Sequence, residues 1–139
     1  MKISTKGRNA VRIMVEIARN KEEFISVADL SKKLGITIKY LEQIINKLTK
    51  SGLLESSRGK TGGYKLVKPA KEYSIGEILE VSGDSPRLAT CLNHKECPMA
   101  ENCDTMGVWV TLTKVINDFL KSVSLQDLID KTYKQKKSL

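Results

Sequence analysis

The sequence predicts a mainly α-helical protein that carries one small β-hairpin. Apolar residues recur at helical spacing through most of the 139 residues, and two short strand-like segments flank a turn rich in glycine and cations around residue 60. Only 5% of the residues are aromatic, so Leu, Ile and Val must supply most of the buried area. The length suits one compact domain with one appended element.

Two helices are expected first. The first should run from Lys6 to Arg19 with Thr5 as its N-cap. The second should begin at Ser26, where Asp29 completes a capping-box pattern, and end at Gly35. The expected buried residues are Val11, Met14, Val15 and Ala18 in the first helix and Ala28, Leu30 and Leu34 in the second.

A third helix is expected from near Thr37 to Gly52, followed by a hairpin with strands Leu53–Ser56 and Gly63–Val67. The apolar stripe of this helix comprises Ile38, Leu41, Ile44, Ile45 and Leu48. Helix, helix, glycine turn, helix and hairpin follow one another as they do in a winged helix-turn-helix domain.

The C-terminal half reads as helices around an irregular segment. Ser74 and Glu77 predict the start of a short helix that ends at Val81, and a long helix is expected from Thr105 to Ser122. A last helix, Leu125–Tyr133, leads into a basic tail. We therefore expect a winged domain at 1–82, a cysteine-bearing loop at 83–104, and a dimerisation helix with the tail at 105–139.

The charge pattern indicates a polyanionic partner. Of the formal net charge of +8, residues 1–80 carry a surplus of seven, from 16 Lys and Arg against nine Asp and Glu. A solvated basic surface is the alternative reading. No apolar run approaches the roughly 20 residues that span a bilayer, and the first residues lack the apolar stretch of a secretory signal. We expect a cytoplasmic protein without a membrane-bound part.

The third helix and the hairpin carry side chains suited to double-stranded DNA. A helix fits the major groove, where Lys, Gln and Glu recognise different base edges. Arg58, between small residues, suits a narrow minor groove, and the amides near Thr37 suit a phosphate. Lys65 is expected near phosphates as well. The candidate DNA-binding residues are Thr37, Lys39, Tyr40, Glu42, Gln43, Arg58, Gly59 and Lys60.

The long C-terminal helix presents an apolar stripe that covers nearly half its surface. A small winged domain cannot bury all of it, so we expect a partner helix in a homodimer, with packing against its own domain as the alternative. The candidate interface residues are Val108, Trp109, Leu112, Val115, Ile116, Phe119 and Leu120.

Three cysteines, Cys91, Cys97 and Cys103, lie within 13 residues. Thiolates are soft ligands that suit an iron–sulfur cluster or zinc, and His94, the only histidine, would allow a Cys₃His zinc site. Three metal-free, oxidation-sensitive thiols are the third possibility. With no paired acid and base and no nucleophile beside a histidine, the sequence does not read as an enzyme.

Three segments, Met1–Val11, Gly35–Gln43 and Arg58–Tyr64, resemble the IscR/CymR/NsrR family of transcription regulators, and the similarity extends over nearly the whole chain. The resemblance implies a winged helix with a long C-terminal dimerisation helix that binds operator DNA as a homodimer. It also implies that residues Thr37 to Gln43, Arg58 and Gly59 read the DNA.

In cluster-binding members of that family, three cysteines at this spacing hold an iron–sulfur cluster, and we favour [2Fe–2S] over [4Fe–4S] or zinc. IscR-type members have a histidine where this chain has Met106, and NsrR-type members have an aspartate where this chain has only Lys6–Asn9. The fourth ligand therefore stays open. The candidates are His94, Glu101, Asp104, the partner subunit's Glu16 and an exogenous ligand. Cofactor-free, CymR-like sensing through a partner protein is the alternative mode of regulation; whether DNA binding represses or activates is open, and we take a repressor as the working expectation.

Overall fold

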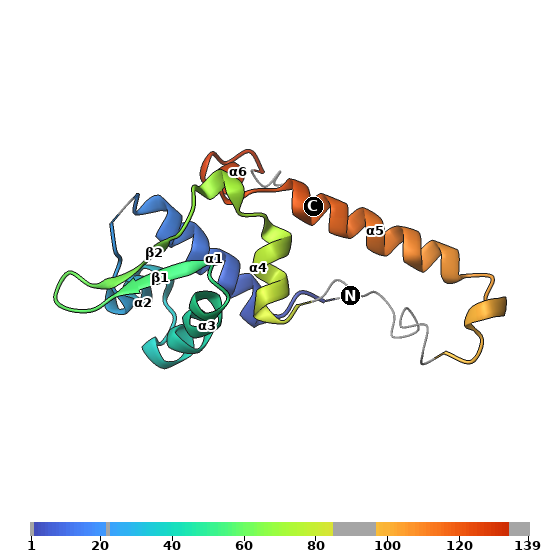
Figure 1. Cartoon of the computed structure of the whole chain (residues 1–139), viewed down its shortest axis with the longest axis horizontal. Coiled ribbons are helices and arrows are strands. Elements are labelled where there is room, and N and C mark those ends of the chain that lie inside the picture. The colour runs from blue at the N-terminus through green and yellow to red at the C-terminus, as the bar shows by residue number, and fades with distance from the viewer. Residues whose placement is uncertain (1, 22, 85–96, 134–139) are drawn as a thin grey trace.

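The computed structural model describes residues 2–21, 23–84 and 97–133. Helices α1 to α4, a two-stranded antiparallel hairpin and α6 form a compact body, from which α5 projects (Figure 1). The predicted mainly helical fold with one hairpin is confirmed. The elements in order are α1 (Thr5–Arg19), α2 (Val27–Leu34), α3 (Ile38–Lys50), β1 (Leu54–Ser57), β2 (Gly63–Leu66), η1 (Ala70–Glu72), α4 (Ile75–Ser82), η3 (Ala100–Asn102), α5 (Met106–Ser122) and α6 (Leu125–Ile129).

The core is built around α1, which packs against α2, α3, α4, β2 and α6. Because each fully buried aliphatic side chain contributes about 1.5–3 kcal/mol, this cluster dominates the stability of the body. The residues that α1 and α3 bury in it are Ala10, Ile13, Met14, Ile17, Leu41, Ile44, Ile45 and Leu48.

The sequence predicted the wrong buried face for α1. Of the four expected residues only Met14 is fully buried, whereas Val11, Val15 and Ala18 are half-buried at the edge of the core. The apolar stripe of this helix is wide, so periodicity alone did not show which part of it the core covers. The N-cap is Ser4 rather than Thr5, and its hydroxyl accepts a hydrogen bond from Gly7 N at 2.9 Å.

Two further burial predictions fail at helix starts. Ala28 is exposed, because it lies two positions from the buried Leu30 and therefore on the opposite side of α2. Ile38 is 49% exposed, because it is the first residue of α3 and the buried residues of this helix begin only at Leu41. Leu34 is half-buried and packs against the core.

The turn between α2 and α3 follows the predicted pattern. Gly35 ends α2 with φ of +65°, a left-handed conformation that favours glycine. Arg12 Nη2 donates to Leu34 O at 3.1 Å and Ser31 Oγ donates to Ile36 O at 2.7 Å. These bonds satisfy carbonyls at the end of α2 and fix the direction in which α3 leaves the turn.

The hairpin is held to the body along β2. Leu54 pairs with Leu66 and Ser57 with Gly63, so the strands begin and end within one residue of the prediction. Ile25 and Tyr64 exchange two backbone hydrogen bonds, of 3.0 and 2.9 Å. A Cβ on Gly63 would collide with the backbone of Ile25, so only glycine allows this approach.

Tyr73 fixes the base of the hairpin. Its ring is fully buried, and its hydroxyl donates to Leu53 O at 2.7 Å. The same oxygen accepts from Val67 N at 2.9 Å and Lys68 N at 3.2 Å. One phenol therefore ties together the backbone on both sides of the hairpin.

The segment after α5 returns to the body. Ile75 N donates to Val123 O at 2.9 Å, and Leu125 N donates to Tyr73 O at 3.0 Å. Ser124 and Asp127 form a complete capping box, which opens α6. At Ser26 and Ser74, where the sequence predicted such boxes, the structure shows the serine hydroxyl accepting from the third helical amide. α6 ends at Ile129, earlier than the predicted Tyr133.

Replacing Tyr73 with phenylalanine should destabilise the protein by about 1–3 kcal/mol, because Leu53 O and Val67 N would lose their partner in a buried place. Urea denaturation, monitored by circular dichroism, measures the change in the free energy of unfolding. Tyr133→Phe is the matched control, since that ring is 51% exposed. Equal stability of the Tyr73→Phe variant and the wild type would contradict the role given to the hydroxyl.

Candidate nucleic-acid interface and cysteine segment

The polar face of α3 is displayed to solvent. Lys39, Glu42 and Gln43 are exposed, opposite the buried apolar stripe of the same helix. Tyr40 is half-buried and packs against the core, which leaves only part of its ring for a ligand. The structure therefore brings four of the predicted reading residues together on one helix.

The N-terminal end of α3 has no negative partner of its own. Thr37 is its N-cap, and the threonine hydroxyl accepts from Tyr40 N at 3.3 Å. Helices α2, α4 and α6 each carry an acidic residue in the first turn, whereas α3 carries none. The positive end of the α3 dipole is thus not neutralised within the helix, as suits an approaching phosphate.

The hairpin tip extends beyond the helical body (Figure 1). Arg58, Gly59 and Lys60 are exposed there, and Gly59 has φ of +105°. Neither tip cation takes part in an ion pair within the part of the chain that the structure describes. Both charges are available to a polyanion.

Lys65 was expected near phosphates, but its ammonium group already has partners within the chain. Its Nζ lies 3.2 Å from Glu55 Oε1 on the paired strand and 4.7 Å from the centre of the Phe24 ring. A carboxylate and an aromatic face therefore hold this ammonium at the root of the hairpin.

Helix α5 turns apolar side chains to solvent. Val108 and Val115 are each 58% exposed and Phe119 is 53% exposed, while Ile116 and Leu120 are half-buried. Trp109 and Leu112 are exposed too, and so is Val110, which the sequence analysis missed. Most of the predicted interface stripe thus does not pack against the body of its own chain.

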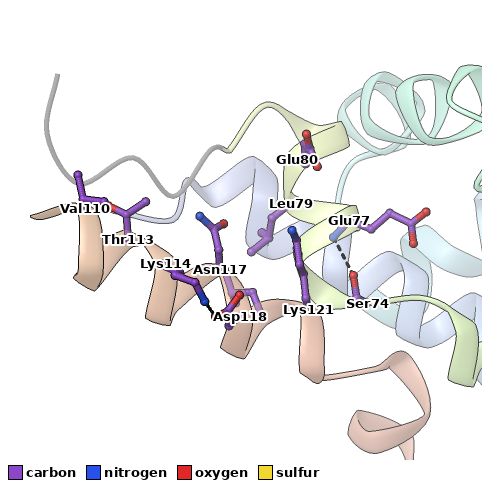
Figure 2. Close-up of a pocket in the computed structure, with 12 residues that line it drawn as sticks. Ser74, Glu77, Leu79, Glu80, Val110, Thr113, Lys114, Asn117, Asp118 and Lys121 are labelled. Carbon is purple, nitrogen blue, oxygen red and sulfur yellow. Dashed lines mark hydrogen bonds and ion pairs between the residues drawn. The ribbon is translucent and has the colours of Figure 1, made fainter. Parts of the chain in front are cut away.

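The side of α5 that faces the body is largely polar. A cleft of about 710 Å³ lies between α4 and α5. Figure 2 shows the residues that line it. Lys114 and Asp118 form an ion pair on its α5 wall. The other residues that line it are Ser74, Gly76, Glu77, Leu79, Glu80, Val110, Thr113, Asn117, Leu120 and Lys121. The helix is amphipathic in the inverse sense, with polar residues toward its own chain and an apolar stripe away from it.

Two of the three cysteines are described, and Cys91 and His94 lie outside the described residues. Cys97 and Cys103 are free and half-exposed. A hydrogen bond with the Thr105 hydroxyl, 3.4 Å away, lowers the pKa of the Cys103 thiol, and backbone amides at the start of α5 add to this. Cys103 is therefore inclined toward the thiolate form that binds metals and reacts with oxidants.

The candidate fourth ligands differ in their surroundings. The Glu16 carboxylate lies 3.2 Å from Lys33 Nζ and 3.5 Å from Arg19 Nη1, whereas Glu101 and Asp104 are exposed. Met106 is buried, with 8% of its surface exposed. Among residues 2–21, 23–84 and 97–133, no three side chains of His, Cys, Asp or Glu come together as a metal site would require.

Sequence analysis missed a pair of hydrogen bonds between Asp84 and Ser4, just before the cysteine segment, which we call the clasp. Asp84 Oδ2 accepts from Ser4 N at 3.0 Å and from Ser4 Oγ at 2.9 Å. A Cβ on Gly7 would collide with this carboxylate, so a larger residue there would displace the Asp84 side chain from Ser4. The two residues are 80 positions apart, and no local pattern reveals their contact. The clasp fastens the end of α4 to the start of α1.

Residues 3–131 match the family described as "Rrf2: Iron-dependent Transcriptional regulator". The chain belongs to the Rrf2 family. It is 35% identical over 131 residues to the HTH-type transcriptional regulator IscR of Pectobacterium atrosepticum, an alignment that covers 94% of this chain and 80% of the relative. It is a transcription regulator of this family and not an enzyme.

Solved structures support the same placement. CymR, described as the global cysteine regulator of B. subtilis, superposes with a TM-score of 0.78 at 29% identity, covering 94% of this chain and 97% of that one. T. potens IscR superposes with a TM-score of 0.73 at 28% identity, covering 99% and 93%. The winged-helix fold is therefore confirmed, and DNA binding follows from the family. None of the described helices is long and apolar enough to cross a lipid bilayer.

Replacing Arg58 with alanine should weaken DNA binding and reduce the salt dependence of log K by about one unit, because an unpaired tip cation would be lost. The loss should be greatest on sites flanked by A·T-rich, narrow minor grooves. Fluorescence anisotropy of labelled duplexes over a salt series measures both effects. Lys65→Ala is the matched control, since that ammonium is already paired; an equal loss for the two variants would contradict the assignment.

Proposed function

We propose that this protein is a homodimeric transcription regulator whose binding to operator DNA is modulated by an iron–sulfur cluster on Cys91, Cys97 and Cys103. The observation that carries the proposal is the combination, in one chain, of a free polar face on α3 with a cysteine segment that leads directly into α5. As a DNA-binding regulator it is expected in the cytoplasm.

In this proposal, α3 lies in the major groove and the hairpin tip reaches the adjacent minor groove. Gln43 and Lys39 contact base edges, and Thr37 with the free amides of α3 holds a phosphate. Glu42 is the only acidic residue of α3. Because a carboxylate near DNA is repelled unless it accepts from a cytosine amine, Glu42 discriminates between operators. Arg58 and Lys60 act at the tip.

The homodimer is supported by the inverse amphipathicity of α5. An apolar stripe of this length on a monomer is exposed to water, whereas a second copy of the helix would cover it. Leu112, Val115 and Phe119 lie at its centre, with Val108 and Trp109 toward the N-terminal end. A twofold dimer would read a pseudo-palindromic site.

The described cysteines suit the proposed cofactor. Cys103 is inclined toward the thiolate form and Cys97 is accessible, as cluster ligands must be. We propose [2Fe–2S], with Cys91 as the third ligand and with His94, Glu101, Asp104 or the partner subunit's Glu16 as the fourth. When bound, a cluster supplies a centre that responds to iron, oxidants or nitric oxide.

The protein residues that would transmit the cluster state lie at the two ends of the cysteine segment. η3 and the N-terminal end of α5 lie far from the hairpin tip (Figure 1), so the signal must pass through the body or through a partner subunit. Asp84, at one end, is fastened to Ser4 at the start of α1. A shift there would move α1 and the α3 helix packed on it. Cluster binding can change DNA affinity only if it favours one of the two arrangements.

A regulator that senses through its thiols without a cluster is the second candidate. The lowered pKa of Cys103 favours it, because a thiolate is also the form that oxidants attack. The structural likeness to CymR fits this reading as well as the likeness to IscR fits the first.

An absorption spectrum of anaerobically purified protein, with iron, sulfide and zinc contents, distinguishes the candidates. A cluster gives visible charge-transfer bands with iron and sulfide in equal amounts, and Cys103→Ser should abolish both while leaving the helical circular dichroism unchanged. Colourless protein that contains zinc, or no metal, would exclude the cluster and leave the thiol-based reading.

Replacing Val115 with lysine should convert the dimer to monomer, because a charge would be buried in the apolar interface. Asn117→Lys is the matched control, since Asn117 lines the polar cleft on the other side of α5. Sedimentation equilibrium measures the mass. A wild-type monomer, or a Val115→Lys variant that still dimerises as tightly as the control, would contradict the assignment of the interface.

A further inference from the structure

We propose that Tyr133 and Phe119 form an aromatic anchor of the homodimer interface, which a second copy of this chain covers. The inference rests on the proposed dimer and extends its surface from α5 to the segment that follows α6. Three observations carry it: the turn that brings Tyr133 back to α5, the contact of its ring with Phe119, and the exposure of both rings beside the apolar stripe.

The chain reverses its direction directly after α6. Thr132 N donates to Asp127 O at 3.0 Å. Lys131 N donates to Leu128 O at 3.2 Å, and the two bonds together close a Schellman turn. Such a turn needs one residue in the left-handed conformation, usually a glycine, but here that residue is Lys131, with φ of +57°. Because a side chain is strained in this conformation, contacts of the residues that follow must hold the turn in place.

The contact that the turn brings about is made by Tyr133. Its ring meets the Phe119 ring edge to face, with 6.1 Å between the centroids and 89° between the planes. Aromatic rings attract each other in this geometry, because the positive edge of one faces the negative face of the other. The sequence predicted that α6 would continue to Tyr133, whereas the turn at Lys131 directs the ring onto α5.

The aromatic pair does not complete the core of its own chain. Phe119 is 53% exposed and Tyr133 is 51% exposed, so about half of each side chain is left to water. Phe119 follows Val115 by four residues and lies in the same apolar stripe of α5. Aromatic residues are enriched in protein interfaces, where a large rigid side chain buries much area. The pair therefore continues the surface that the proposed dimer buries.

A second copy of the chain suits this surface because the surface carries no charge from α5. The charged residues of α5 are Lys114, Asp118 and Lys121, and all three line the cleft toward α4. In a twofold dimer the same patch meets itself, so a patch without charges is not repelled by its copy. The rings are continuous with the stripe, and a partner helix that covers Val115 and Phe119 also meets Tyr133.

The anchor would also restrict how the two winged bodies lie in the dimer. α5 packs chiefly against α4, whereas α6 packs against α1 and η1. Because α5 projects from the body (Figure 1), a partner held by α5 alone would be joined to a single projecting helix. A partner that also contacts Tyr133 is joined to the body through α6, which limits the spacing between the two α3 helices.

Sedimentation equilibrium of the full chain tests the anchor. Tyr133→Ala should weaken the dimer by about tenfold or more, because truncating an interface anchor has an effect of this size and twofold symmetry removes two anchors at once. Tyr133→Phe keeps the ring and should dimerise as tightly as the wild type. Val67→Ala is the matched control, since Val67 lies just after β2, away from α5, and is 55% exposed.

The turn at Lys131 supplies a second test that leaves the ring intact. Lys131→Val should weaken the dimer as well, because a β-branched residue strongly disfavours a positive φ. Lys131→Gly relieves the strain, so this variant should unfold at a higher temperature and dimerise at least as tightly as the wild type.

Photo-crosslinking shows whether residue 133 meets the second copy. Tyr133→p-benzoylphenylalanine should join two chains covalently on illumination, whereas the same amino acid in place of Val67 should not. Cross-links from position 133 that stay within one chain would overturn the anchor. So would a wild-type dimer that Tyr133→Ala weakens no more than Val67→Ala does. A wild-type monomer would instead contradict the dimer of the proposed function.

Discussion

The burial of four side chains of α3 in the core is the contact on which the rest of the structure depends. Leu41, Ile44, Ile45 and Leu48 are at most 1% exposed, and they fix the rotation of the helix about its axis. Because a helix shows its other face to solvent once one face is buried, this packing decides that Lys39, Glu42 and Gln43 face outward. The exposed position of these polar side chains is in this sense a consequence of the core, to which α1 contributes the facing apolar residues.

Helix α5 has the opposite arrangement of polar and apolar faces. Its polar residues line the cleft toward α4, and its apolar residues face away from the body. Such an arrangement is unstable in water for an isolated chain, and it makes sense if the core that α5 belongs to is completed by a second copy. The cysteine segment ends where this helix begins. In the proposed dimer, a change at Cys103 would therefore act on the helix that joins the two DNA-binding domains. The clasp between Asp84 and Ser4 ties the other end of the segment to the winged body.

Local signals made much of this fold predictable. α3, its Thr37 cap, the glycine turn and the hairpin follow from the residues near them, because caps and turns are set by short-range hydrogen bonds. The sequence did not identify the buried face of α1, since the apolar stripe of that helix is wide and only the packing partners select Ala10, Ile13 and Ile17 from it. The contacts of Tyr73, and of Asp84 with Ser4, join residues distant in sequence and leave no periodic trace. The ion pair between Lys65 and Glu55 likewise could not be predicted without knowing the strand register. The assignment of DNA-reading and cluster-binding residues stays a prediction.

The proposed regulation depends on coupling between the cysteine segment and the DNA-binding face of α3. Its most direct test is the affinity for one operator duplex, measured by anaerobic anisotropy at a fixed salt concentration, of the same preparation before and after removal of its cluster. We expect the affinities of the two forms to differ at least fivefold, which is the lower end of the coupling of about 1–3 kcal/mol that is typical between linked sites. Equal affinities of the two forms for every operator tested would contradict it.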